Sequence, residues 1–147
     1  MRNLQHPGAC KRQAGFTLVE VLVAAILLTI GITAILTAIG SANRSSAASA
    51  KLNQAVFLAQ EIHERVAQLP FVDPNMITTY KPPKNAMGSV IPNMTTWSQA
   101  ITITWRDPNS LGTTVTAGTS DIAYVNVVVS ESNVPQLTTG WYVRKKN

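Results

Sequence analysis

The side chains that could do chemistry in this chain of 147 residues are few, and most of them stand alone. The two histidines, His6 and His63, are far apart, and no second nitrogen or sulfur ligand lies beside His63 in the sequence, so a zinc site is not predicted. No serine stands in a G-x-S-x-G or S-x-x-K pattern next to a base. The sequence therefore predicts no catalytic residue, no metal site and no cofactor, and it does not indicate an enzyme.

The other charged residues downstream of the first helix are dispersed. Asp73, Asp107 and Asp121 stand singly where loops or strand ends are expected, and a lone aspartate there is more typical of a turn than of a calcium site, which needs several oxygen ligands. The basic run at residues 144–146 offers three charges, too few for strong binding to nucleic acid phosphates. We therefore expect neither a calcium site nor a nucleic acid partner.

One carboxylate, that of Glu20, lies where a charge needs an explanation. It is part of the stretch GFTLVEVLVA at residues 15–24 and precedes 23 uncharged residues, 21–43, which as a helix of ~1.5 Å rise per residue could cross a hydrocarbon layer of ~30 Å. An acid near the centre of such a span costs roughly 2.5 to 3.5 kcal/mol. Cleavage between Gly15 and Phe16 would supply a compensating α-amine, because residues four apart share a helical face.

The residues Gly15 to Glu20, G-F-T-L-V-E before an apolar helix, resemble the class III signal of bacterial type IV prepilins and pseudopilins. This resemblance implies that a prepilin peptidase cuts after Gly15 on the cytoplasmic side and methylates Phe16. It implies that Glu20 is the assembly glutamate, facing the N-terminal amine of a neighbouring subunit. The implied partners are the peptidase, other pilin or pseudopilin subunits and an inner-membrane assembly platform.

Within this family, the run EVLVA at residues 20–24, followed by Thr29-Ile30-Gly31, resembles PilV-type minor pilins, and GspI-type pseudopilins share its first half. The resemblance implies a small subunit of a pilus priming or tip complex. A minor pseudopilin of a type II secretion system remains an alternative, because pseudopilins share the N-terminal cleavage site, methylation and assembly glutamate that the resemblance implies.

Two further alternatives exist for the apolar stretch. An ordinary secretory signal peptide could end at Ala48-Ser49-Ala50, but its apolar region would be about twice the usual 7 to 15 residues. A plain single-pass anchor leaves Gly15 and Glu20 unexplained. The cations at residues 2, 11 and 12 predict a cytoplasmic N-terminal side, which places the chain in the inner membrane with a periplasmic C-terminal domain before it enters a pilus or pseudopilus.

The expected fold is α+β and type IV pilin-like: one long helix over residues 16–69, packed on a small antiparallel sheet. Residues 1–15 are the predicted leader, 16–43 the transmembrane and assembly helix, and 44–69 its amphipathic continuation, which Pro70 ends. Apolar residues at steps of three and four trace one stripe on that continuation: Leu52, Ala55, Val56, Ala59, Ile62, Val66 and Leu69. We expect the sheet to cover this stripe.

Prolines and an absence of period predict a loop over residues 70–95, followed by the sheet over residues 96–147. Alternation predicts strands at residues 101–106 and 122–130, with shorter strands at 113–117 and 141–143 and a turn at 107–112. The result is a sheet of three or four strands, in which the tryptophans are core residues. Cys10 is the one cysteine and lies in the predicted leader, so no disulfide is expected.

Overall fold

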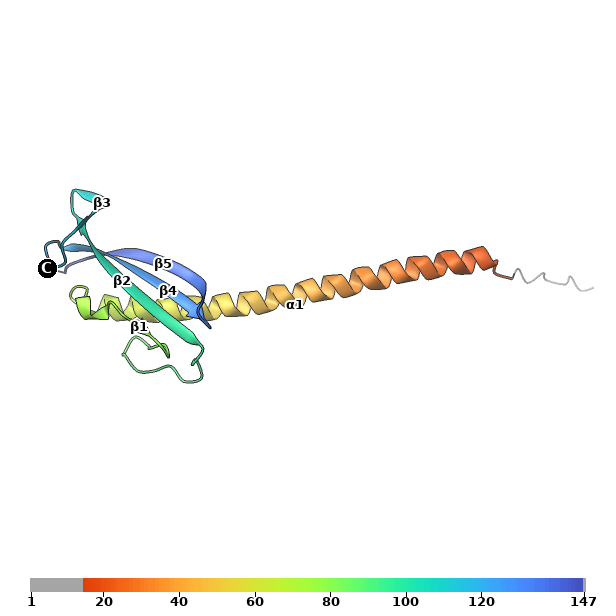
Figure 1. Ribbon diagram of the computed structural model, residues 1–147, viewed down its shortest axis with the longest axis horizontal. Helices are drawn as coiled ribbons and strands as arrows, with labels where there is room; N and C mark the ends of the chain where they lie inside the picture. The colour runs from red at the N-terminus through yellow and green to blue at the C-terminus, as the bar shows by residue number, and fades with distance from the viewer. Residues whose placement is uncertain (1–14, 147) are drawn as a thin grey trace, which may run out of the picture. The chain divides into compact units, whose positions relative to one another are not determined.

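The computed structural model describes residues 15–146, so the predictions for the leader, including Cys10 and its three cations, lie outside the described residues. The chain divides into two compact units, Met1–Arg44 and Ser45–Asn147. The helix α1, Leu18–Gln68, contributes residues to both units (Figure 1). Each unit is described by itself below.

In the first unit the described structure is the start of α1 and the three residues before it, 15–17, and this part contains no proline and no run of charges. Apolar side chains point to all sides of this part of the helix, and all of them are exposed. A helix that is hydrophobic all round belongs inside a large protein or a membrane. By length and composition, α1 is a candidate membrane span.

The second unit contains one antiparallel sheet and the end of α1. Its strands are β1 (Thr79–Tyr80), β2 (Trp97–Asp107), β3 (Ser110–Val115), β4 (Ile122–Glu131) and β5 (Val134–Arg144), with a short 3₁₀ helix at Pro74–Met76. The strand order is β1-β2-β4-β5, and β3 pairs with the same outer edge of β2 as β1, farther along the strand. The strand β5 is therefore one lateral edge of the sheet (Figure 1).

The core of the second unit lies between one face of this sheet and α1. Alternate residues of β4, from Ala123 to Val129, are fully buried, and the residues opposite them on β2 include the buried Ile101 and Ile103. From α1 the core takes Ala55, Leu58, Ala59, Ile62 and Val66. The predicted α+β fold, a long N-terminal helix with a small antiparallel sheet, is confirmed.

The helical stripe was predicted with some wrong members. Leu58 is completely buried, whereas Leu52 and Val56 are 47% and 45% exposed. The helical period alone fits two neighbouring sets of apolar residues on α1. The position of the sheet determines which of these sets is buried. Trp97 and Trp105 are core residues as predicted, while Trp141 is half-buried beside the core.

The sheet has five strands, so the prediction of three or four was too low, and β5 is longer than the predicted 141–143. β5 includes Pro135, the second residue of the strand. An edge strand tolerates proline because one side of it makes no ladder hydrogen bonds, and the register of β4 and β5 shifts there, at Val129/Ser130. β1 was missed because two residues show no period.

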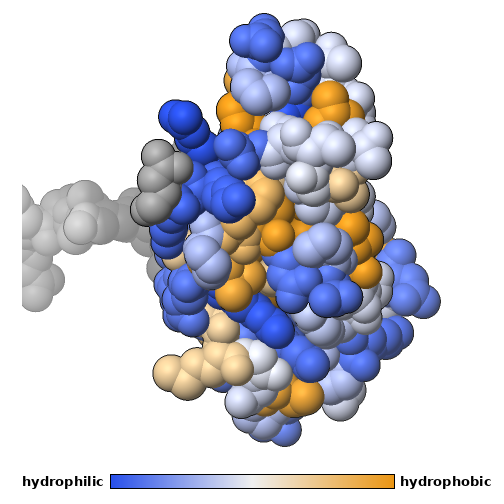
Figure 2. All heavy atoms as spheres, turned by 90° about the vertical axis from the view of Figure 1, so that its left-hand side faces the viewer, coloured by the Kyte–Doolittle hydropathy of each residue, from blue (hydrophilic) through white to orange (hydrophobic). Residues whose placement is uncertain are grey.

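The surface of the second unit carries both hydrophilic and hydrophobic residues. On the face shown in Figure 2, hydrophobic residues come to the surface in separate spots among hydrophilic ones. Scattered apolar residues of this kind are normal for a protein surface.

The loop at residues 81–96 is held to the helix by buried polar contacts. Gln99 is fully buried on β2; its Nε2 donates to the backbone oxygens of Leu58 (2.8 Å) and Lys84 (3.1 Å), and its Oε1 accepts from the Lys84 N–H (2.8 Å). The Glu61 carboxylate accepts a hydrogen bond from the Ala86 N–H (2.6 Å). It therefore binds the loop and makes no ion pair with Arg65, one turn farther along the helix. One glutamine therefore joins helix, sheet and loop.

We predict that Gln99→Leu lowers the free energy of unfolding by about 2 kcal/mol, because the Lys84 N–H and C=O lose a buried partner. The measurement is urea unfolding of the full chain in detergent, followed by tryptophan fluorescence. Gln54→Leu, the same substitution at an exposed helical position, is the matched control and should change stability by less than about 0.5 kcal/mol. Equal effects of the two substitutions would contradict the role of Gln99.

Candidate processing and assembly site

The peptide bond between Gly15 and Phe16 lies just before α1 begins at Leu18, outside the helix. Phe16 is 84% exposed, and a Cβ placed on Gly15 would meet nothing within 4 Å. A peptidase needs an accessible peptide bond, and these two residues are exposed and lie outside the helix. The predicted cleavage after Gly15 and methylation of Phe16 remain predictions.

The helix begins with a capping box formed by Thr17 and Glu20. The Glu20 N–H donates to Thr17 Oγ1 (3.3 Å), and the Thr17 N–H donates to Glu20 Oε2 (3.4 Å). The Thr17 hydroxyl also lies 3.5 Å from the same carboxylate oxygen. These reciprocal bonds satisfy two of the backbone donors that a helix leaves free at its N-terminus.

This arrangement changes the expected role of Glu20 within its own chain. Phe16 lies outside the helix, so the argument that residues four apart share a helical face does not apply to it in the uncleaved chain. The carboxylate instead caps the helix through Thr17. All three distances are at the long end for hydrogen bonds, so the carboxylate can exchange these partners for a stronger one such as an amine.

Thr17 is the functional residue that the sequence analysis missed. The signal was present, because Thr17-Leu18-Val19-Glu20 fits the pattern S/T-x-x-E followed by an apolar run. A carboxylate at the start of a helix is also favoured by the helix dipole. The charge near the membrane span therefore has a local explanation in addition to the predicted one.

Polar groups inside the apolar part of α1 are satisfied without any partner chain. The hydroxyls of Thr29, Thr33 and Thr37 each donate to the carbonyl oxygen four residues earlier, at 2.7 Å. In lipid an unsatisfied polar group costs several kcal/mol, so this back-bonding lets the threonines remain in a hydrocarbon layer. The three threonines lie on one face of the helix, where small side chains allow close helix packing.

Other candidate residues do not gather into a site. Within residues 15–146 no cluster of three or more histidine, cysteine or acidic residues exists. Asp73 and Asp107 are turn residues as predicted, accepting hydrogen bonds from the N–H groups of Asn75 and Asn109. His63 is exposed, and its ring packs against that of Trp141 with centroids 4.8 Å apart.

The comparison with family models matches residues 10–36 to a prokaryotic N-terminal methylation motif. No curated protein and no solved structure matches the chain. The motif supports the resemblance to type IV pilin-like proteins at the level of the broad family, and it indicates a substrate of prepilin peptidase that assembles with other pilins. The long apolar helix fits a membrane-anchored member of that group.

We predict that Thr17→Ala in the uncleaved chain weakens the start of α1 by about 1 kcal/mol, the usual cost of losing an N-cap side chain. Hydrogen exchange of the Glu20 amide in detergent should then become roughly fivefold faster. Thr17→Ser keeps the hydroxyl and should leave exchange close to that of the wild type. An unchanged rate in Thr17→Ala would show that the capping box does not hold the helix end.

Proposed function

We propose that this chain is a minor type IV pilin-like subunit that is cut by prepilin peptidase after Gly15, methylated at Phe16 and built into a pilus through its N-terminal helix. It works by assembly in a priming or tip complex, with other pilin-like subunits and an inner-membrane platform, and not by catalysis. The observation that carries the proposal is the methylation motif at the head of a helix whose apolar side chains are uncovered on all sides over residues 18–43.

Assembly moves this helix from lipid to the apolar centre of a helical bundle. Little hydrophobic free energy is gained by that exchange, because lipid is as apolar as the side chains that replace it. The register between subunits must then come from close packing and from charge. A contact between Glu20 of one subunit and the Phe16 amine of the next is head-to-tail, so it produces an open helical filament and not a closed ring.

The capping box suggests how the charge is carried until assembly. Before cleavage, the Glu20 carboxylate is occupied by two groups of Thr17 through long hydrogen bonds. Cleavage creates an α-amine next to Thr17, and an ionised donor makes a bond about twice as strong as a neutral one. The carboxylate therefore has a better partner available only in processed chains.

A minor pseudopilin of a type II secretion system is the alternative within the same family, since the methylation motif is common to both. Genes for pilus or secretion components beside this one would separate the two. A plain membrane-anchored domain is the alternative outside it, and it predicts that the chain keeps its leader where a prepilin peptidase is present.

Mass spectrometry of the chain recovered from cells tests processing. We expect a mature N-terminus at N-methyl-Phe16, and we expect Gly15→Val to abolish cleavage. Since a side chain at Gly15 meets nothing within 4 Å, loss of cleavage would report on the peptidase and not on folding. Recovery of the intact leader in the wild-type chain, with an active peptidase present, would contradict the proposal.

The charge of Glu20 can be tested apart from its capping role, because glutamine also serves in a capping box. We expect Glu20→Gln and Glu20→Ala to insert and be cleaved, but to enter filaments at least about tenfold less than wild type, the effect of losing roughly 1.4 kcal/mol. Immunoblots of sheared filaments, with wild type in competition, give the ratio. Glu64→Ala removes an exposed helical carboxylate and is the control. Normal entry of Glu20→Gln would show that the charge is dispensable.

A further inference from the structure

β5 is a long sheet edge without a partner in the described part of the chain. The opposite outer edge, that of β2, is covered at one end by β1 and at the other by β3. β5 pairs only with β4. Native proteins usually shorten such edges or interrupt them with charges, because an open edge recruits further strands.

The direction of the free backbone groups follows from the register. The Lys145 N–H donates to the Asp121 carbonyl (2.9 Å), so this pair faces inward, toward β4. In an antiparallel ladder the inward-facing residues alternate with outward-facing ones. Thr138, Gly140 and Tyr142 therefore direct their N–H and C=O groups away from β4, toward solvent.

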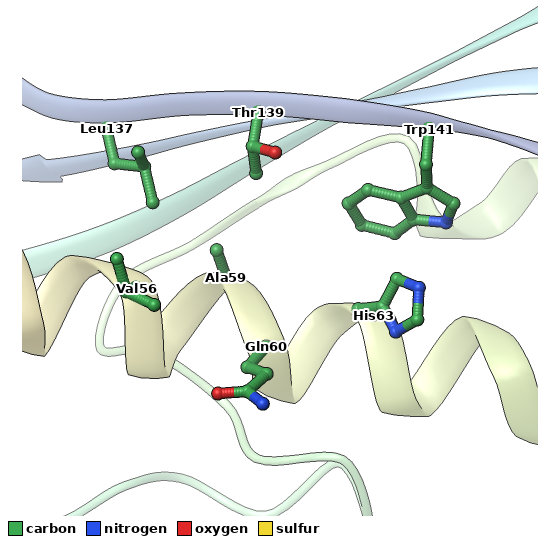
Figure 3. Close-up of a pocket in the computed structure, with 7 residues that line it drawn as sticks. All are labelled: Val56, Ala59, Gln60, His63, Leu137, Thr139 and Trp141. Carbon is green, nitrogen blue, oxygen red and sulfur yellow. The ribbon is translucent and has the colours of Figure 1, made fainter.

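An apolar groove lies beside this edge, between β5 and α1. Its volume is about 310 Å³, and Figure 3 shows side chains of both elements around it. The groove is lined by Val56, Ala59, Gln60 and His63 of α1 and by Leu137, Thr139 and Trp141 of β5. A strand added to β5 would direct every second side chain toward this groove.

The charges along β5 are concentrated at one end. Charged residues and prolines protect exposed edge strands in other proteins. Residues 136–143 contain neither. Arg144 and Lys145 follow directly, both are exposed, and neither makes an ion pair within residues 15–146. An acidic residue at the end of a bound segment, beside Arg144 and Lys145, would therefore stabilise the bound state.

We propose that β5 binds an extended segment of a neighbouring pilin-like subunit by strand addition. The segment places alternate apolar side chains in the groove beside Trp141 and an acidic residue beside Arg144 and Lys145. This inference rests on the proposed function, because it names a contact within that assembly.

A second copy of this chain is a poorer occupant. A parallel pair of β5 strands would set Arg144 and Lys145 of both chains next to each other, and like charges at neighbouring positions are destabilising. An antiparallel pair would turn one subunit end for end, which subunits of a polar filament do not do. The β5 strand of a second copy is therefore not the occupant that we propose.

Hydrogen exchange of the full processed chain tests the contact, measured alone in detergent and after co-assembly with the pilin-like subunits of its own filament. We expect the amides of Thr138, Gly140 and Tyr142 to exchange at least about tenfold more slowly after assembly. Exposed amides of β3 at residues 111–113 serve as the control and should not change. Equal rates at β5 before and after assembly would overturn the inference.

Two substitutions at Thr138 make the test specific. Thr138→Pro removes an outward N–H but no bond to β4, and Thr138→Lys places a charge on the edge while keeping the donor. Both should reduce co-assembly at least about tenfold, whereas Thr138→Ala should stay within about twofold of wild type. Thermal unfolding identifies any variant that loses the fold, and Thr138→Lys keeps the strand intact if the proline does not.

The outcomes separate this inference from the proposed function. Normal co-assembly of a folded Thr138→Lys variant overturns the strand addition and leaves the proposed function standing. Protection of β5 in the chain alone, rising with its concentration, shows that a second copy is the occupant and also overturns the proposal. A wild-type chain that is neither cleaved nor assembled refutes the proposed function itself.

Discussion

The structure depends on one constraint: a helix that is apolar on every side must always be surrounded by something apolar. Within residues 18–43 the large apolar side chains are all exposed, so the described part of the chain supplies no cover for them. The helix can meet the constraint in lipid or in a bundle of like helices because its hydrogen bonds are internal. The hydroxyls of Thr29, Thr33 and Thr37 also have hydrogen-bond partners within the helix, because each donates to a carbonyl oxygen of α1.

In the second unit the same helix is apolar on one side only. There its apolar residues shrink to a stripe, and the sheet covers that stripe from Ala55 to Val66. Hydrophobic burial alone does not determine the position of the loop at residues 81–96, and polar contacts then fix it. Gln99 and Glu61 hold the loop at residues 81–96 through its backbone, so these hydrogen bonds give the loop a defined place. Burial supplies the stability, and these few hydrogen bonds supply the arrangement.

Much of this fold could be predicted because periodicity reports burial directly. The alternation in β2 and β4 and the stripe on α1 were visible in the sequence for that reason. β1 and the first half of β5 were not, because a two-residue strand has no period and an edge strand tolerates Pro135. At the N-terminus, the positions of Gly15 and Glu20 pointed to processing and assembly, while Thr17 was missed. The capping pattern of Thr17 and Glu20 was present in the sequence, and the start of α1 at Leu18 shows that these two residues cap the helix.

An apolar helix surface gives little selectivity between neighbours, because lipid and other apolar helices bury it with almost the same free energy. Selection must come from groups whose needs are directional or charged. Within residues 15–146, two candidates for such groups are the Glu20 carboxylate, held by long bonds to Thr17, and the outward backbone of β5. Both are occupied weakly or not at all by the chain itself. In the proposed assembly, the apolar surface keeps the subunit in lipid, and these two polar features select its neighbours.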